Sequence, residues 1–135
     1  MTNNAVNAAS EFSGKTALVV DDGPIERLAG KSMLQKMGFS AQAAANGEEA
    51  LHMLGTQPVD IAICDISMPG MSGLELLDAA KNLQSMPLFI MVSSHDDEAH
   101  AQAALARGAA AYLVKPLRFE SLRDAIASVF QSRKA

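Results

Sequence analysis

Short apolar runs alternate along this 135-residue chain with segments in which apolar residues recur every three or four positions. Five such runs stand out, at residues 16–20, 40–45, 59–64, 88–92 and 111–114. Runs of this length fit buried strands, and the segments between them fit helices that connect parallel strands. The pattern therefore predicts an α/β fold, in which five helices cover a doubly wound, five-stranded parallel sheet.

Helix signals stand between the apolar runs. Pro24 suits a first helical turn, Gly38 suits a helix end, and Asn46 can cap a second helix. Three further helices are expected after the turn at 68–70, over about 97–107 and around 122–130.

The segment 1–14 differs from the rest of the chain. It is rich in Asn, Ala and Ser and shows no sustained period, so we expect a flexible leader there. Residues 15–134 are expected to form one domain, because a chain of this length buries a sufficient core without disulfides or a structural metal.

Polar side chains stand at the exits of four predicted strands: Asp21 and Asp22 after the first, Asp65 after the third, Ser93 after the fourth and Lys115 after the fifth. Because ligands of doubly wound sheets bind outside the carboxyl ends of the strands, these groups are expected to share one crevice. Three carboxylates there would repel one another without a cation. The available ligands are oxygens, which favours Mg²⁺, with Mn²⁺ as a substitute.

A carboxylate beside Mg²⁺ can act as a nucleophile toward a phosphoryl group if the charge on the transferring group is neutralised. Asp65 fits the nucleophile, and Lys115 fits the neutralising ammonium. The hydroxyl of Ser93 can donate to a phosphoryl oxygen only once that oxygen is present, so its position can report whether the acceptor is occupied. These residues predict a switch rather than a catalyst.

Four motifs occur in the chain: Val-Val-Asp-Asp at 19–22, Ile-Cys-Asp-Ile-Ser-Met-Pro-Gly-Met-Ser-Gly at 63–73, Val-Ser-Ser at 92–94 and Tyr-Leu-Val-Lys-Pro at 112–116. With these motifs, in this order, the chain from about Lys15 to Arg133 closely resembles the response-regulator receiver family, in particular its chemotaxis-regulator type. The resemblance implies a flavodoxin-like strand order of 2-1-3-4-5 and a role in two-component signalling.

The resemblance also implies roles for the matching residues. Asp65 would be the phosphoacceptor. Mg²⁺ would be held by Asp22, Asp65 and the backbone carbonyl of Ser67, and through a water by Asp21. Lys115 would hold the phosphoryl group.

Three further positions follow from the same resemblance. Ser93 and Tyr112 fall on the family's two switch positions, where a hydroxyl swings toward the phosphate and an aromatic ring moves inward. Pro116 falls on the proline that usually follows a cis peptide bond. His95, two positions past Ser93, is a candidate for tuning the access of water to the acyl phosphate.

The implied partners are a histidine kinase or a histidine phosphotransfer protein as donor, and an unidentified downstream protein as target. A net charge of −4 and a pI near 5.2 give no basis for direct binding to nucleic acid or to an anionic membrane. The single cysteine, Cys64, and the absence of a long apolar run point to the cytoplasm. A lone receiver is expected to be a monomer, and a dimer through the last two helices is the alternative.

Other functions are also compatible with the fold class. A protein-interaction module that needs no phosphorylation would ordinarily have lost the acceptor, an acidic residue or the lysine, and all of these are present. A phosphatase of the haloacid-dehalogenase type needs a second Asp two residues after its nucleophile, where this chain has Ser67. The chain could also be a receiver excised from a larger regulator.

Overall fold

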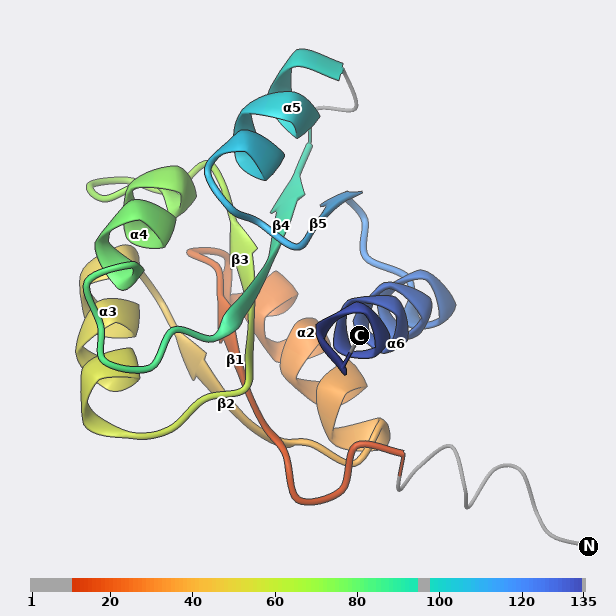
Figure 1. The fold of residues 1–135 in the computed structure, drawn as a ribbon. Coiled ribbons are helices and arrows are strands. Elements are labelled where there is room, and N and C mark those ends of the chain that lie inside the picture. The colour runs from red at the N-terminus through yellow and green to blue at the C-terminus, as the bar shows by residue number, and fades with distance from the viewer. Residues whose placement is uncertain (1–10, 95–97, 135) are drawn as a thin grey trace, which may run out of the picture.

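The computed structural model describes residues 11–94 and 98–134 of the chain. Its sheet contains β1 (Thr16–Val20), β2 (Ser40–Ala44), β3 (Ile61–Asp65), β4 (Leu88–Ser93) and β5 (Ala111–Val114). The strand order is β2-β1-β3-β4-β5, and all neighbouring strands are parallel (Figure 1). The doubly wound, flavodoxin-like sheet predicted from the sequence is thereby confirmed.

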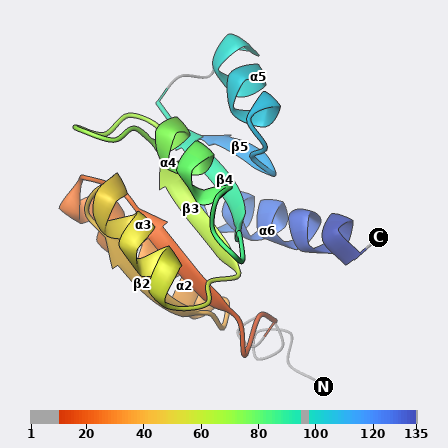
Figure 2. The same cartoon turned by 60° about the vertical axis from the view of Figure 1, so that its left-hand side comes forward.

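Five helices cover the two faces of this sheet: α2 (Pro24–Lys36), α3 (Gly47–Thr56), α4 (Gly73–Ala80), α5 (Glu98–Ala106) and α6 (Phe119–Lys134). Buried residues of α3, α4 and α5 belong to one apolar cluster, and those of α2 and α6 belong to a second cluster on the other face (Figure 2). Among the described residues, no helix is both long enough and apolar enough to cross a membrane.

The central strand β1 shows how the sequence forms these two layers. Leu18 and Val20 belong to the cluster beneath α3 and α4, whereas Ala17 and Val19 belong to the cluster beneath α2 and α6. Successive side chains of a strand point to opposite faces, so a strand covered on both faces needs a continuous apolar run. The same reason explains why such runs identify the strands in the sequence.

The second strand, expected at 40–45, ends at Ala44, and the third, expected at 59–64, begins at Ile61. Two strands also extend beyond their predicted ends: the third includes Asp65, and the fourth continues from Val92 to Ser93. The parallel register explains both extensions, because Asp65 is paired with Val92 and Ser93 with Val114. A residue with a polar side chain at the end of a strand can therefore still be paired with the neighbouring strand through its backbone.

Phe12 lies within the segment expected to be a leader, yet its ring is only 5% exposed. It stacks on Phe39 with ring centroids 4.9 Å apart and contacts Phe130 of α6 at 5.8 Å. Glu11 Oε1 also lies 2.9 Å from Arg123 Nη2. The described part of the expected leader is thus packed on the domain, and residues 1–10 lie outside the described residues.

Candidate functional site

Three aspartates meet at the carboxyl edge of the sheet. Asp21 and Asp22 follow β1, and Asp65 is the last residue of β3. One carboxylate oxygen from each residue lies within 4.8 Å of the others. Asp21 and Asp65 are buried, whereas Asp22 is exposed. The acidic part of the crevice predicted from the strand exits therefore forms, whereas Ser93 does not line the cavity there.

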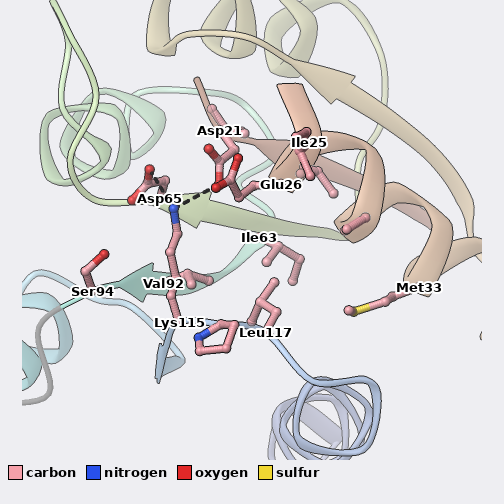
Figure 3. A pocket seen from close by; sticks show the side chains of 15 residues that line it. Asp21, Ile25, Glu26, Met33, Ile63, Asp65, Val92, Ser94, Lys115 and Leu117 are labelled. Carbon is pink, nitrogen blue, oxygen red and sulfur yellow. Dashed lines mark hydrogen bonds and ion pairs between the residues drawn. The ribbon is translucent and has the colours of Figure 1, made fainter. Parts of the chain in front are cut away.

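Lys115, directly after β5, reaches the same place. Its Nζ atom lies 3.2 Å from Oδ2 of Asp21 and 3.2 Å from Oδ2 of Asp65 (Figure 3). The backbone N–H of Lys115 donates to the carbonyl oxygen of Ser93 at 2.8 Å, and the peptide bond between Lys115 and Pro116 is cis, as the resemblance implied. One ammonium group is thus shared by two carboxylates.

Burial and this shared contact act in opposite directions on the pKa of Asp65 and of Lys115. Burial raises the pKa of Asp65; the hydrogen bond and charge of Lys115 oppose the rise, and the charge of Asp21 adds to it. Burial alone would lower the pKa of Lys115, but hydrogen bonds and charges from Asp65 and Asp21 outweigh it, so the pKa of Lys115 is raised. Three carboxylates meet here and one ammonium group contacts two of them, which favours binding of a further cation.

The loop between β1 and α2 is fixed by contacts around Asp21. Asp21 Oδ1 accepts a hydrogen bond from the backbone N–H of Gly23 at 2.9 Å, and the carbonyl oxygen of Asp21 accepts one from Arg27 Nη1 at 2.8 Å. These bonds orient Asp21. The sequence pattern did not predict the contact of Arg27, because an arginine on a first helical turn is ordinarily a solvated residue.

The loop between β3 and α4 brings a helix N-terminus against the Asp65 backbone. Ser72 and Glu75 form a capping box at the start of α4, and the N–H of Gly73 donates to the carbonyl oxygen of Ile66 at 2.8 Å. A Cβ on Gly73 would overlap the backbone oxygen of Asp65. The backbone N–H of Ser67 donates to Asp65 Oδ1 at 3.2 Å.

The two predicted switch residues lie on neighbouring strands, Ser93 on the inner strand β4 and Tyr112 on the edge strand β5. Ser93 ends β4 and is 1% exposed, while Tyr112 lies in β5, partly buried against the cluster that α3, α4 and α5 cover. Tyr112 is in register with Met91, two residues before Ser93. His95, the candidate for tuning the phosphate lifetime, lies outside the described residues.

A cavity of about 460 Å³ extends from this acidic edge between α2 and the segment that follows β5. Its polar end is lined by Asp21, Glu26, Asp65, Ser94 and Lys115. Its remaining wall is mostly apolar and includes Val19, Ile63, Met33 and Leu117. Glu26 had no assigned role in the sequence, since it belongs to no strand exit and no motif, whereas Ser94 is the last residue of the Val-Ser-Ser motif.

Comparison with known proteins assigns the chain to a family. Residues 17–127 match the model of the response regulator receiver domain, and this range is most of the chain. The chain therefore belongs to the response regulator receiver family. Members of this family are phospho-acceptor switches of two-component signalling rather than enzymes in the ordinary sense.

Curated relatives agree with this assignment. The chain is 33% identical over 126 residues to "Regulator of RpoS" of Escherichia coli, with 89% of this chain and 37% of that protein covered. It is 32% identical over 118 residues to a "Cyclic di-GMP phosphodiesterase" of Thermotoga maritima, with 87% and 32% covered. "Probable chemotaxis protein CheY" of Rhizobium etli is 32% identical over 120 residues, with 87% and 93% covered. The chain thus spans about a third of the first two relatives and nearly all of the third.

Solved structures show the same fold. The chemotaxis protein CheY4 of Vibrio cholerae superposes with a TM-score of 0.79 at 30% identity, with 85% of this chain and 98% of that chain covered. A CheY-like receiver domain of Methanospirillum hungatei gives a TM-score of 0.80 at 30% identity, with 89% and 97% covered.

Proposed function

We propose that Asp65 accepts a phosphoryl group from the phosphohistidine of a histidine kinase or a histidine phosphotransfer protein, in a reaction that requires Mg²⁺, and that the acyl phosphate switches a protein-binding surface. The observation that carries this proposal is the position of Lys115 Nζ, 3.2 Å from carboxylate oxygens of both Asp21 and Asp65. An ammonium group fixed there can neutralise a phosphoryl oxygen without further reorganisation.

The donors at this edge fit Mg²⁺, because three carboxylates lie close together and supply hard oxygen ligands. Asp22 and Asp65 would bind the ion directly, together with the backbone carbonyl of Ser67, and Asp21 would bind it through a water. Mn²⁺ would substitute for Mg²⁺. When bound, the ion neutralises negative charge on the phosphoryl oxygens.

The residues of the chain hold the nucleophile in place. Ser67 N–H donates to one oxygen of Asp65 and Lys115 contacts the other, so the carboxylate has a fixed orientation before the donor arrives. An oxygen of Asp65 forms the new bond to phosphorus, the bond from phosphorus to the donor nitrogen breaks, and the imidazole leaves with the electron pair. Lys115 then binds an oxygen of the transferred group.

The proposed switch runs through Ser93 and Tyr112. Movement of the Ser93 hydroxyl toward the phosphoryl group would make space for the Tyr112 ring to move inward. The surface formed by α5, β5 and α6 would then change. Leu105 on α5 and Val114 on β5 are already 43% and 40% exposed, which gives this surface apolar contacts for a protein target.

We also propose that the protein acts in the cytoplasm as a monomer, with dimerisation through α5 and α6 as the alternative. The free, buried thiol of Cys64 is compatible with a reducing compartment. The Rhizobium etli relative, of which the chain covers 93%, illustrates a regulator without a further large domain. The longer relatives illustrate the other arrangement, a receiver within a larger regulator.

The test is the mass of the intact protein after incubation with acetyl phosphate, with and without Mg²⁺. We expect a single, base-labile phosphoryl adduct on the wild type in the presence of Mg²⁺ and none on Asp65→Asn. Asp124→Asn is the matched control, because the Asp124 side chain is 76% exposed. If the folded wild type forms no adduct, an interaction module that needs no phosphorylation is favoured.

A further inference from the structure

Glu26 brings a fourth carboxylate to the mouth of the crevice, one that the chemistry proposed for Asp65 does not require. It lies in the first turn of α2 and lines the same cavity as Asp65 and Lys115. Its side chain lies beside that of Asp21 (Figure 3).

Gly23 makes this position of Glu26 possible. A Cβ on residue 23 would overlap Glu26 Oε1 and would lie 3.3 Å from Asp21 Oδ1. The carboxylates of Glu26 and Asp21 therefore flank the same point of the backbone. Because Gly23 has no side chain, the Glu26 carboxylate can occupy the space that a Cβ would fill.

An ordinary capping role does not explain this glutamate. A Glu three residues after an N-cap usually accepts from the N-cap N–H, as Glu75 does from Ser72 at 2.9 Å. At α2 the N–H of Gly23 donates to Asp21 Oδ1 instead. Within residues 11–94 and 98–134, the Glu26 carboxylate makes no hydrogen bond and no ion pair. Glu26 is exposed, so its charge lies at the mouth of the crevice, outside any ion pair between described residues.

We propose that Glu26 makes the acceptor site selective among phosphoryl donors according to their charge. The negative charge of Glu26 slows phosphoryl transfer from small dianionic donors. It has a much smaller effect on donors that also carry a compensating positive charge. The proposal rests on the proposed function of Asp65. A fixed charge beside the entrance changes the free energy of a donor's approach in proportion to the donor's charge, and added salt weakens the effect.

Acetyl phosphate and phosphoramidate separate the two donor classes. In both reactions an oxygen of Asp65 forms the new bond to phosphorus. With acetyl phosphate, a dianion at neutral pH, the bond from phosphorus to the acyl oxygen breaks and acetate leaves with the electron pair. With phosphoramidate, whose ammonium group leaves it a monoanion, the bond from phosphorus to nitrogen breaks and ammonia leaves.

The experiment compares initial rates of adduct formation with each donor at saturating Mg²⁺ and low ionic strength, in wild type, Glu26→Gln and Glu120→Gln. Glu120 is the matched control, because it also lies in a first helical turn and does not line the cavity. We expect Glu26→Gln to react about threefold faster with acetyl phosphate and less than about twofold faster with phosphoramidate. High salt should remove the difference, and Glu120→Gln should behave as wild type.

Gly23→Ala gives an independent test of the same geometry. Residue 23 has φ −86° and ψ 121°, which alanine adopts readily, so this change displaces the Glu26 carboxylate without forcing the backbone. We expect the same change in donor preference as in Glu26→Gln, and no further change in the double variant. An additive effect in the double variant would show that the two residues do not act through one contact and would overturn the geometric argument.

Mg²⁺ titration by calorimetry adds a readout that needs no phosphoryl transfer. We expect Glu26→Gln to bind Mg²⁺ about two- to fivefold more weakly, because a nearby negative charge is lost. If the wild type forms no adduct, the proposed function of Asp65 fails. If the wild type forms the adduct and Glu26→Gln shows an unchanged ratio of the two donor rates, only the role of Glu26 fails.

Discussion

Lys115 Nζ lies 3.2 Å from Oδ2 of Asp65, a residue fifty positions earlier in the chain. β4 separates the strands from which the two residues extend. The contact thus links an edge strand to the centre of the sheet.

Replacing Lys115 should separate metal binding from phosphoryl transfer. In Lys115→Ala we expect Mg²⁺ to bind at least as tightly as in wild type, since a competing cation is lost from the carboxylates. Adduct formation should slow by about tenfold or more, because the transferring group loses its ammonium. Calorimetry and the time course of intact mass measure the two effects. Loss of Mg²⁺ binding in a folded variant would contradict this role.

Asp65→Asn should stabilise the metal-free protein at neutral pH. The pKa of Asp65 is raised in the folded state, so the protonated carboxyl group favours folding. This contribution to stability is fully present below the pKa of Asp65 in the unfolded chain and is lost as the pH rises through the pKa in the folded state. At neutral pH the ionised carboxylate therefore lowers stability. We expect a gain on the order of 1 kcal/mol in the free energy of unfolding.

The pH dependence checks this sign. In urea unfolding without Mg²⁺, the advantage of Asp65→Asn should shrink as the pH falls below the ordinary carboxyl pKa. Saturating Mg²⁺ should also reduce it, because the ion favours the ionised carboxylate. A metal-free wild type that is more stable than Asp65→Asn at neutral pH would refute the argument.

Gly73→Ala should destabilise the junction between β3 and α4. The new Cβ would overlap the backbone oxygen of Asp65 and lie 2.9 Å from Met91 Cε, so α4 or β3 has to shift. We expect a loss of about 2 kcal/mol or more. Gly55→Ala is the control, because its Cβ would meet only Leu83 Cδ2 at 3.8 Å and it should stabilise α3 by about 0.5–1 kcal/mol. Chemical denaturation of both variants measures the contrast.

The apolar runs predicted the sheet because strands covered on both faces have to be apolar. Strand order and the meeting of Asp21, Asp65 and Lys115 followed from family motifs and parallel topology. The exact strand ends at Asp65 and Ser93 did not follow, since backbone pairing there does not depend on side-chain polarity.

Other parts of the structure had no local signal. Phe12 is a single aromatic residue in a polar segment, and its partners Phe39 and Phe130 are distant in sequence. The positions of Arg27 and Glu26 depend on which backbone groups of the β1–α2 loop are available: the carbonyl oxygen of Asp21 accepts from Arg27, and the N–H of Gly23 donates to Asp21 and not to Glu26. Hydrophobic periodicity carries no information on either point.

Phe12→Ala should show that the aromatic cluster contributes to stability. We expect a loss of about 3 kcal/mol in the free energy of unfolding, because a buried ring leaves a cavity between Phe39 and Phe130. Glu11→Gln, which removes only the partly exposed ion pair to Arg123, should cost less than about 1 kcal/mol. Equal losses in the two variants would indicate that the ion pair, and not the ring, holds the segment.

The contact between Phe12 and Phe130, with ring centroids 5.8 Å apart, also brings the segment before β1 to the last helix. A circularly permuted chain should therefore tolerate a short linker that joins α6 to residue 11. New ends could be placed between α3 and β3, at residues 57–58, in the loop that leads into the opposite end of β3 from Asp65. Such a permutant would keep the acceptor crevice intact while changing the order in which the strands are synthesised.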